Sequence, residues 1–489
     1  MTEKVGVEPS VSAGARPGAP RTIARGGILA LLCTTNFMVI LDSQIVILAL
    51  PSIEKSVGLS LSEGQWVLSA YLLSFGGLLL LGGRMADVLG RRRMYVVGTA
   101  LFLLSSLLCG FAWAPAVLIG ARVGQGISAA IMAPTALSIL MNAFPEGAAR
   151  NRALAFWSGI GGLGATAALL IGGLLTDLLG WEWVFFLNVP VAAVLLLAAP
   201  ILLTEGRDRA RARAYDPAGA TAITGALVLL LYAVVRAPEV GWATMHTLAF
   251  LAGAVVLIAA FLLIERRSAA PLVPLRIFRS AAFVGGNLSM LVISMLAFGM
   301  SLMLSIYAQQ VLDYSPIVFG LGTTAMTVMT LVGSYAAQRF IATVGYRWVT
   351  AAGLVLLGAG SLLLTEVSVG GSYFGDIFPG LFVFGPGMGA TVSAAAAALA
   401  GVRERDAGLA SGINSAAFQL GGAFGVAIVS SVAATEVLAP SDSLLSLNSA
   451  VRAGFAACVG FAVVGLVLAL LLLRSPRADV TGLGQLDAR

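Results

Sequence analysis

Long apolar runs recur along the chain and are separated by short polar segments. Because a helix needs about 20 apolar residues to cross the hydrocarbon core of a bilayer, each run predicts one membrane-spanning helix. There are fourteen such runs, at residues 26–50, 64–83, 94–112, 115–140, 153–176, 183–203, 217–235, 246–265, 281–309, 316–337, 348–365, 373–400, 407–432 and 450–473. Composition agrees, since 59% of the 489 residues are hydrophobic and 11% are charged. The pattern predicts an all-α polytopic membrane protein.

The basic residues assign the helix ends to the two sides of the membrane. Cytoplasmic loops of membrane proteins are enriched in Lys and Arg. Of the 29 Lys and Arg residues, Lys55, Arg236 and Arg452 fall in loops on one side, Arg122 falls inside a helix, and the others lie on the opposite side. Both termini are therefore predicted to be cytoplasmic. The formal charge of +6 is explained by this topology, so no nucleic-acid partner is expected.

An internal repeat predicts how the helices are grouped. Arg84, Gly90 and Arg92 have the same spacing as Arg339, Gly345 and Arg347, and each set lies between the second and third helices of a six-helix unit. The predicted organisation is two six-helix bundles with two helices inserted between them. Its parts are a disordered cytoplasmic tail (1–25), the first bundle (26–204), the insertion with its loops (205–280), the second bundle (281–474) and a C-terminal cytoplasmic tail (475–489).

Two ionisable residues lie deep inside predicted helices. Asp42 precedes the outer helix end at Leu50 by eight residues, or about 12 Å, and Arg122 lies at a similar depth in the fourth helix. Ionisable groups inside a membrane are costly and point to function. One interpretation is proton binding at Asp42, switched by the distance to Arg122. The other is an ion pair that only fixes the packing of two helices.

The hairpin at residues 83–93 carries the candidate gating residues Gly83, Asp87, Gly90, Arg91 and Arg92. Its arginines set the topology and its glycines permit a tight reversal. A simple topological loop needs no acid, however. Asp87 is therefore predicted to pair with cations or a helix end of the second bundle when the inner side is closed.

The sequence offers little support for other chemistry. It has no P-loop pattern for ATP, its one histidine (His246) has no neighbouring metal ligand, and its three cysteines lie in apolar runs. We therefore expect no enzyme activity, no metal and no cofactor. A membrane sensor or scaffold is disfavoured, because it would not require an acid and a base at matched depth.

Four segments together resemble one family, the major facilitator superfamily and within it the fourteen-span drug:proton antiporters of bacteria. They are the hairpin at 83–93, the first-helix segment at 41–51, the Arg-x-x-Gln-Gly segment at 122–126, and the segment at 408–427. The resemblance implies a transporter of the bacterial cytoplasmic membrane, in which Asp42 and Arg122 couple transport to protons. A fifth segment departs from the family pattern, because Ala168 and Leu169 replace Gly-Pro in the fifth helix. Its glycines Gly164, Gly172 and Gly173 predict close packing of this helix against the facing bundle.

The resemblance also suggests which side chains line a central cavity between the bundles. The candidates are Asn36, Gln44, Gln125, Trp157, Met295, Phe298, Met326 and Phe418. Methionine adapts to varied shapes, as a polyspecific site requires, although methionines also serve as ordinary packing residues. The expected function is proton-coupled efflux of lipophilic neutral or cationic compounds by a monomer in contact with membrane lipids. The alternative is movement of lipids or lipid-like metabolites between leaflets.

Overall fold

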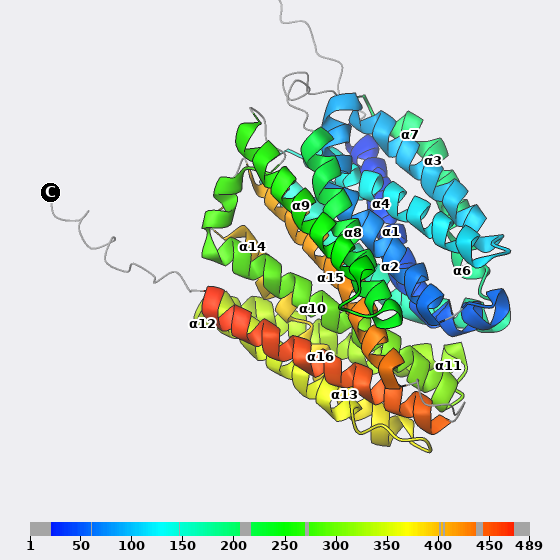
Figure 1. Cartoon of the computed structure of the whole chain (residues 1–489). Helices are drawn as coiled ribbons and strands as arrows, with labels where there is room; N and C mark the ends of the chain where they lie inside the picture. The colour runs from blue at the N-terminus through cyan, green and yellow to red at the C-terminus, as the bar shows by residue number, and fades with distance from the viewer. Residues whose placement is uncertain are drawn as a thin grey trace, which may run out of the picture.

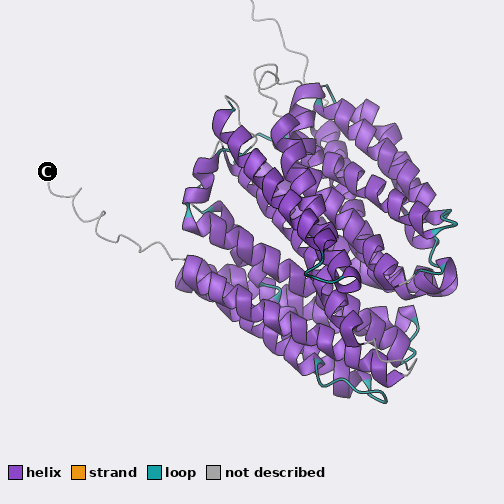
Figure 2. Cartoon of the chain, viewed as in Figure 1, coloured by secondary structure: helices purple, strands orange, loops and turns teal. Residues whose placement is uncertain are grey.

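The computed structural model describes residues 21–59, 61–145, 147–205, 217–268, 273–400, 402–403, 406–436 and 444–473. These residues are almost entirely helical and include no strand (Figure 2). The prediction of an all-α protein is confirmed. Most of the predicted N-terminal tail, the predicted C-terminal tail and the arginine-rich loop at 206–216 lie outside the described residues.

The first helices follow the first six apolar runs. They are α1 (Arg21–Val57), α2 (Leu61–Leu89), α3 (Arg91–Gly110), α4 (Pro115–Ala143), α5 (Ala148–Leu178), and the pair α6 (Trp183–Phe186) and α7 (Asn188–Leu202). The last two correspond to one predicted span and are separated only at Leu187. Helix α5 runs without interruption through Ala168 and Leu169, as expected for a segment that lacks proline.

The remaining helices follow the later runs. They are α8 (Pro217–Val240), α9 (Met245–Arg267), the short η1 (Leu275–Arg279), α10 (Ala281–Ile306) with the π-helical turn η2 (Tyr307–Val311), α11 (Pro316–Gly322), α12 (Thr324–Leu364), η3 (Tyr373–Ile377), α13 (Phe378–Gly387), α14 (Ala390–Leu399), α15 (Ala407–Glu436) and α16 (Leu444–Leu472). Several of these pieces join into one apolar segment, as η3, α13 and α14 do at residues 373–399.

Two glycines at equivalent positions of the repeat break the helices. Gly90 has φ 107° between α2 and α3, and Gly345 has φ 80° within α12. A positive φ is costly for residues with a side chain, so glycine is favoured at both positions. The sequence repeat therefore corresponds to a repeated backbone reversal. Because of it, α12 contains two of the predicted spans.

Twelve segments of the described chain are long and apolar enough to cross a membrane. One of them, residues 316–364, includes the break at Gly345, and α8 contributes only a shorter apolar stretch at 221–234. The predicted count of fourteen spans therefore stays a prediction. The multi-pass helical architecture itself does not depend on that count.

The early and late helices form two adjacent groups (Figure 1). Helix α1 packs against α5 and α4, and α2 packs against α4, whereas α10 packs against α15 and α16, and α12 against α13. The hairpin of α8 and α9 lies over the junction, with α8 contacting both α2 and α15. The Thr224 hydroxyl on α8 donates to the Gly77 carbonyl on α2 at 2.9 Å. The exact domain boundaries remain a prediction.

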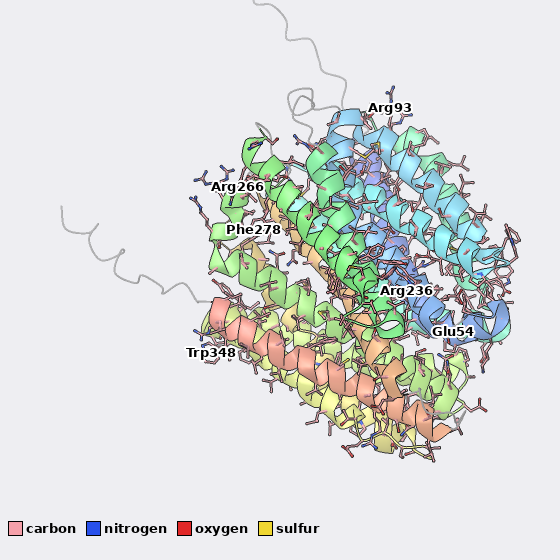
Figure 3. All side chains as sticks on the ribbon, viewed as in Figure 1. Glu54, Arg93, Arg236, Arg266, Phe278 and Trp348 are labelled. Carbon is pink, nitrogen blue, oxygen red and sulfur yellow. The ribbon has the colours of Figure 1, made fainter. Side chains whose placement is uncertain are left out.

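Residues expected on opposite sides of the membrane lie at opposite helix ends. In Figure 3, Arg93 lies at the top and Arg266 and Trp348 lie on the left, whereas Glu54 and Arg236 lie on the right. At the end near Glu54, α1 contacts α10 and α5 contacts α11. The positive-inside rule assigns this end to the outer side, and it is called the outer end below.

The packing of α2 against α4 depends on glycine. A side chain at Gly126 would overlap Ser74 and the backbone of Tyr71, whereas one at Gly120, on the same helix, would meet nothing within 4 Å. We predict that Gly126→Leu lowers the thermal unfolding midpoint of the purified protein strongly, because overpacking costs about 1–3 kcal/mol or more.

Gly120→Leu is the matched control, since both variants place leucine in α4. It should leave the midpoint within a few degrees of wild type. Equal midpoints for the two variants would contradict the packing described here.

Candidate functional site

A fully buried ion pair joins α1 to α4. Arg122 Nη1 donates to Asp42 Oδ2 at 2.8 Å, and both side chains are 0% exposed. The two residues that the sequence placed at equal depth therefore meet. Burying either charge alone would be strongly unfavourable, so each requires the other.

Two amide side chains complete the surroundings of the Asp42 carboxylate. Asn188 Nδ2, at the start of α7, donates to Asp42 Oδ1 at 2.7 Å, and Gln125 Nε2 donates to the same oxygen at 3.2 Å. Gln125 also accepts from Arg122 Nη1 at 2.8 Å and donates to Ser106 Oγ on α3 at 2.9 Å. Three N–H donors on two oxygens suit the charged form of a carboxylate.

The Arg122 guanidinium is held from several sides. Its Nε donates to the Val67 carbonyl of α2 at 3.0 Å, and its central carbon lies 4.2 Å from the centroid of the Tyr71 ring. Tyr71 is itself positioned by a 3.2 Å hydrogen bond from its hydroxyl to the Val39 carbonyl. Arg122 Nη2 has no hydrogen-bond partner among the described residues. The cation is thus fixed but retains one unused donor.

The arrangement can store and release a charge inside a dry environment. While Arg122 and the two amides contact Asp42, the carboxylate is compensated. If Arg122 moves away, a buried carboxylate without its cation takes up a proton rather than remain charged. Such a site is suited to carrying a proton in step with a change of conformation.

The candidate cavity residues do not form one cluster. Asn36 Nδ2 donates to the Trp157 carbonyl at 3.0 Å, which joins α1 to α5. Phe298 and Phe418 contact each other edge to face, with centroids 5.9 Å apart, and Phe298 is almost fully buried. Met295 is also buried, whereas Gln44, Met326, Trp157 and Phe418 are partly exposed. Gln125 belongs to the ionic network rather than to an exposed surface.

One small cavity lies elsewhere, between α10, α15 and α16. It has a volume of about 40 Å³ and is lined by Met303, Ile306, Gln310, Ser430, Ala433, Leu447, Ala450 and Val451. This volume is enough for only a few water molecules. The cavity therefore does not correspond to a drug-sized site.

In the hairpin at 83–93, Asp87 pairs with a residue of its own loop. Arg91 Nη2 donates to Asp87 Oδ1 at 2.9 Å. Gly90 provides the reversal, and a side chain at Gly83 would meet Pro134 at 3.3 Å. Of the predicted partners near the start of α15, Arg405 lies outside the described residues, and Asp406 pairs instead with Arg276 at 3.1 Å. The role of Asp87, and that of Arg92, as gating residues stays a prediction.

The glycines of α5 face different neighbours. A side chain at Gly164 would meet the Phe37 backbone, and one at Gly172 would meet Ile45, both on α1. A side chain at Gly173 would overlap the backbone of Pro316 and Ile317 at the start of α11. The sequence predicted that all three glycines pack against the facing bundle; in the structure the contact with that bundle is made at Gly173, and the gating role of the three stays a prediction. The helix rotation that decides it depends on packing, which spacing alone does not reveal.

Sequence reasoning missed Asn188, Tyr71 and Glu265. Asn188 lies at the start of α7, and Tyr71 lies within α2 among apolar residues. An amide or a phenol is common at such positions, so neither residue stood out. The signal for Asn188 was a polar residue just before Pro190 in an apolar run. Glu265, near the end of α9, is 4% exposed, and its Oε1 accepts from the Val273 backbone N–H at 3.3 Å. Asp42 and Arg122 are therefore not the only buried charges.

A family model described as Major Facilitator Superfamily matches residues 32–286 and 282–488. The chain is 36% identical to the puromycin resistance protein pur8 of Streptomyces alboniger, covering 93% of each chain. It is 36% identical to the cephamycin export protein CmcT of Amycolatopsis lactamdurans, covering 91% of each. The multidrug resistance protein Stp of Mycobacterium tuberculosis is 33% identical over 84% of this chain and 76% of its own.

Solved structures share the fold at lower sequence identity. A bacterial homologue of the human lysosomal transporter Spinster, in an inward-facing and unoccupied conformation, has a TM-score of 0.64 at 16% identity, covering 95% of this chain and 100% of its own. The POT family transporter PepTSo has a TM-score of 0.65 at 16% identity, covering 94% and 98%. These likenesses support the fold alone.

The chain belongs to the Major Facilitator Superfamily. It is a multi-pass transporter of the bacterial inner membrane and not an enzyme. The family resemblance inferred from the motifs is thereby confirmed.

The contact of Gly173 with α11 yields a prediction for closure of the outer end. In Gly173→Leu, the side chain should hold α5 and α11 apart. The rate at which an impermeant maleimide labels Leu48→Cys from outside should then rise by at least about fivefold. This factor corresponds to the low end of the cost of overpacking, about 1 kcal/mol. Leu48 is suitable because it is fully buried and lies beside Gly320 of α11.

Gly159→Leu is the control on the same helix, since a side chain there would meet nothing within 4 Å. Its labelling rate should equal that of the Leu48→Cys parent. An unchanged rate in Gly173→Leu would show that the α5–α11 contact does not limit closure.

Proposed function

We propose that this transporter exports lipophilic neutral or cationic small molecules in exchange for protons, by alternating access of its two helix groups. The observation that carries the proposal is the buried Asp42–Arg122 pair with its amide donors Asn188 and Gln125. A proton-driven cycle needs a group that changes charge within the membrane. In this proposal Asp42 is that group, and its three hydrogen-bond donors, Arg122, Asn188 and Gln125, are affected by any movement of α1.

The substrate class is proposed from the relatives and from the distribution of charge. The relatives' names refer to puromycin, cephamycin and multiple drugs. The acids of the second helix group lie at helix ends or in loops, as Asp313, Glu366 and Asp376 do. A substrate with several positive charges would therefore find few counter-charges, which favours neutral compounds and monocations.

Export of compounds of this kind is tested with proteoliposomes that contain a pH-sensitive dye. Adding a transported compound, with puromycin as the first probe, should change the lumenal pH in the direction expected for exchange with protons. Substrate movement without any proton movement would contradict proton coupling. Movement of a labelled phospholipid, with no response to puromycin, would favour lipid transport instead.

For Asp42 we predict that Asp42→Asn abolishes transport driven by a pH gradient while substrate binding is retained. The amide cannot take up the proton, yet it fills the same volume. The measurement is gradient-driven uptake together with equilibrium binding of the same compound.

Asp177→Asn is the matched control, because Asp177 is an exposed residue at the end of α5. It should transport as wild type does. Gradient-driven transport at the wild-type rate in Asp42→Asn would rule out Asp42 as the proton carrier.

For Asp87 we propose a role in closing the inner side, with its carboxylate leaving Arg91 to contact the second helix group. Loss of the charge in Asp87→Asn should shift the population toward the inward-open state by roughly 5- to 150-fold, the usual range of coupling energies. Labelling of Trp157→Cys from the cytoplasmic side should rise accordingly. Lost transport with unchanged labelling would indicate a role in folding or insertion.

A further inference from the structure

A proline inside α1 leaves a backbone carbonyl group available to the second helix group. Pro51 lies six residues before the end of α1 at Val57, and the helix continues through it. Proline has no backbone N–H, so the carbonyl of the residue four positions earlier, Ile47, loses its helical partner. A buried carbonyl requires another donor, and Ile47 is 1% exposed.

That donor comes from α10. Ser305 Oγ donates to the Ile47 carbonyl at 2.9 Å, and Gln309 Nε2 donates to the adjacent Leu48 carbonyl at 3.1 Å. Gln309 Nε2 also donates to Ser305 Oγ at 2.8 Å, so the two side chains act as a unit. Ser305 and Gln309 are 0% and 8% exposed. These hydrogen bonds therefore lie in a buried seam between the two helix groups.

The local backbone of α10 supports this arrangement. Gln309 and Gln310 belong to η2, a π-helical turn in which the Leu312 N–H donates to the Tyr307 carbonyl at 3.0 Å. Such turns are rare and occur frequently at functional sites. Gln310 Nε2 reaches Glu54 Oε2 of α1 at 3.4 Å, one step nearer the outer end. The neighbouring side chains Gln309 and Gln310 of η2 thus contact α1 at two different levels, Leu48 and Glu54.

We propose that Ser305 and Gln309 form a latch that holds the outer end closed by donating to the α1 carbonyls next to Pro51. The proposal rests on the proposed function, in that α1 and α10 belong to helix groups that separate during transport. Ser305 and Gln309 are positioning residues, since they act on α1 and not on the substrate. When the outer end opens, their hydrogen bonds break and the Ile47 carbonyl is exposed to water.

The latch also connects closure to the ionic site. Ile47 follows Asp42 by five residues on the same helix, or about 7.5 Å along its axis. A shift of α1 that changes the contact between Asp42 and Arg122 therefore also moves the carbonyls that Ser305 and Gln309 hold. No additional connecting element is needed between the proton site and the outer seam.

The latch is tested by measuring the distance between α1 and α11 with paired spin labels. Cysteines at Ser56→Cys and Val318→Cys are exposed, whereas the native Cys33, Cys109 and Cys458 are buried and react little. The experiment uses purified full-length protein without a pH gradient, under conditions in which wild type shows both a short and a long distance. Ser305→Ala should raise the ratio of long to short distances about three- to fivefold, as expected for loss of one buried hydrogen bond. Gln309→Leu should raise the ratio similarly.

Pro51→Ala provides the decisive comparison, because alanine restores the N–H that satisfies Ile47 within α1. In the Pro51→Ala background, Ser305→Ala should change the ratio by less than about twofold, since a satisfied carbonyl gains little from a second donor. An equally large effect in both backgrounds would overturn the proposal, as would an unchanged ratio in both Ser305→Ala and Gln309→Leu.

Ser294→Ala is the matched control. Ser294 is also a buried serine of α10 that donates to a backbone carbonyl, but that carbonyl belongs to Phe418 on α15, in the same helix group. Its removal should leave the distance ratio unchanged. Because the readout requires no transport, failure of the latch is distinguishable from failure of proton coupling, which the Asp42→Asn experiment tests separately.

Discussion

The buried pair of Asp42 and Arg122 is the interaction on which the arrangement of the first helices depends. A charge without a partner would be prohibitively costly at this depth, so α1 and α4 must meet at this level. Helix α7 contacts the pair through Asn188, and α2 contacts it through the Val67 carbonyl. Gln125 of α4 adds a further hydrogen bond to Asp42. The pair is therefore structural, and it is also the site at which we propose that a proton binds. The two interpretations suggested by the sequence describe one site, because a pair that positions five helices also makes them sensitive to its charge.

Much of the fold could be predicted because the bilayer imposes simple constraints on sequence. Helix length follows from membrane thickness, and the distribution of arginines follows from sidedness. The repeat was visible because Gly90 and Gly345 both require a positive φ, which few other residues tolerate. Equal depth likewise showed that Asp42 and Arg122 could meet if the first and fourth helices were neighbours, which the sequence alone did not establish. Each of these features depends on position along a helix axis, and that is what a sequence encodes directly.

Features that depend on rotation about a helix axis could not be predicted in the same way. Gly172 and Gly173 are adjacent, yet one faces α1 and the other α11. Asn188 reaches Asp42 from the start of α7, and no periodicity in the sequence marks which face of that helix it lies on. The assignment of the candidate cavity residues stays a prediction for the same reason. Their assignment required knowing which face each helix presents, and in a uniformly apolar helix no amphipathic pattern reveals it.

Helix α1 is held by an ionic contact within its own helix group and by hydrogen bonds to the other group. Its carboxylate at Asp42 is held by α4 and α7 of the first helix group, and its carbonyls at Ile47 and Leu48 are held by α10 of the second. The ionic contact is strong, and its buried charges have no water to replace it. The hydrogen bonds to the carbonyls are weak, and water at the outer surface can replace them. A reversible gate needs that asymmetry. Strong bonds keep α1 within its own group, and weak bonds to the other group allow separation without loss of the fold.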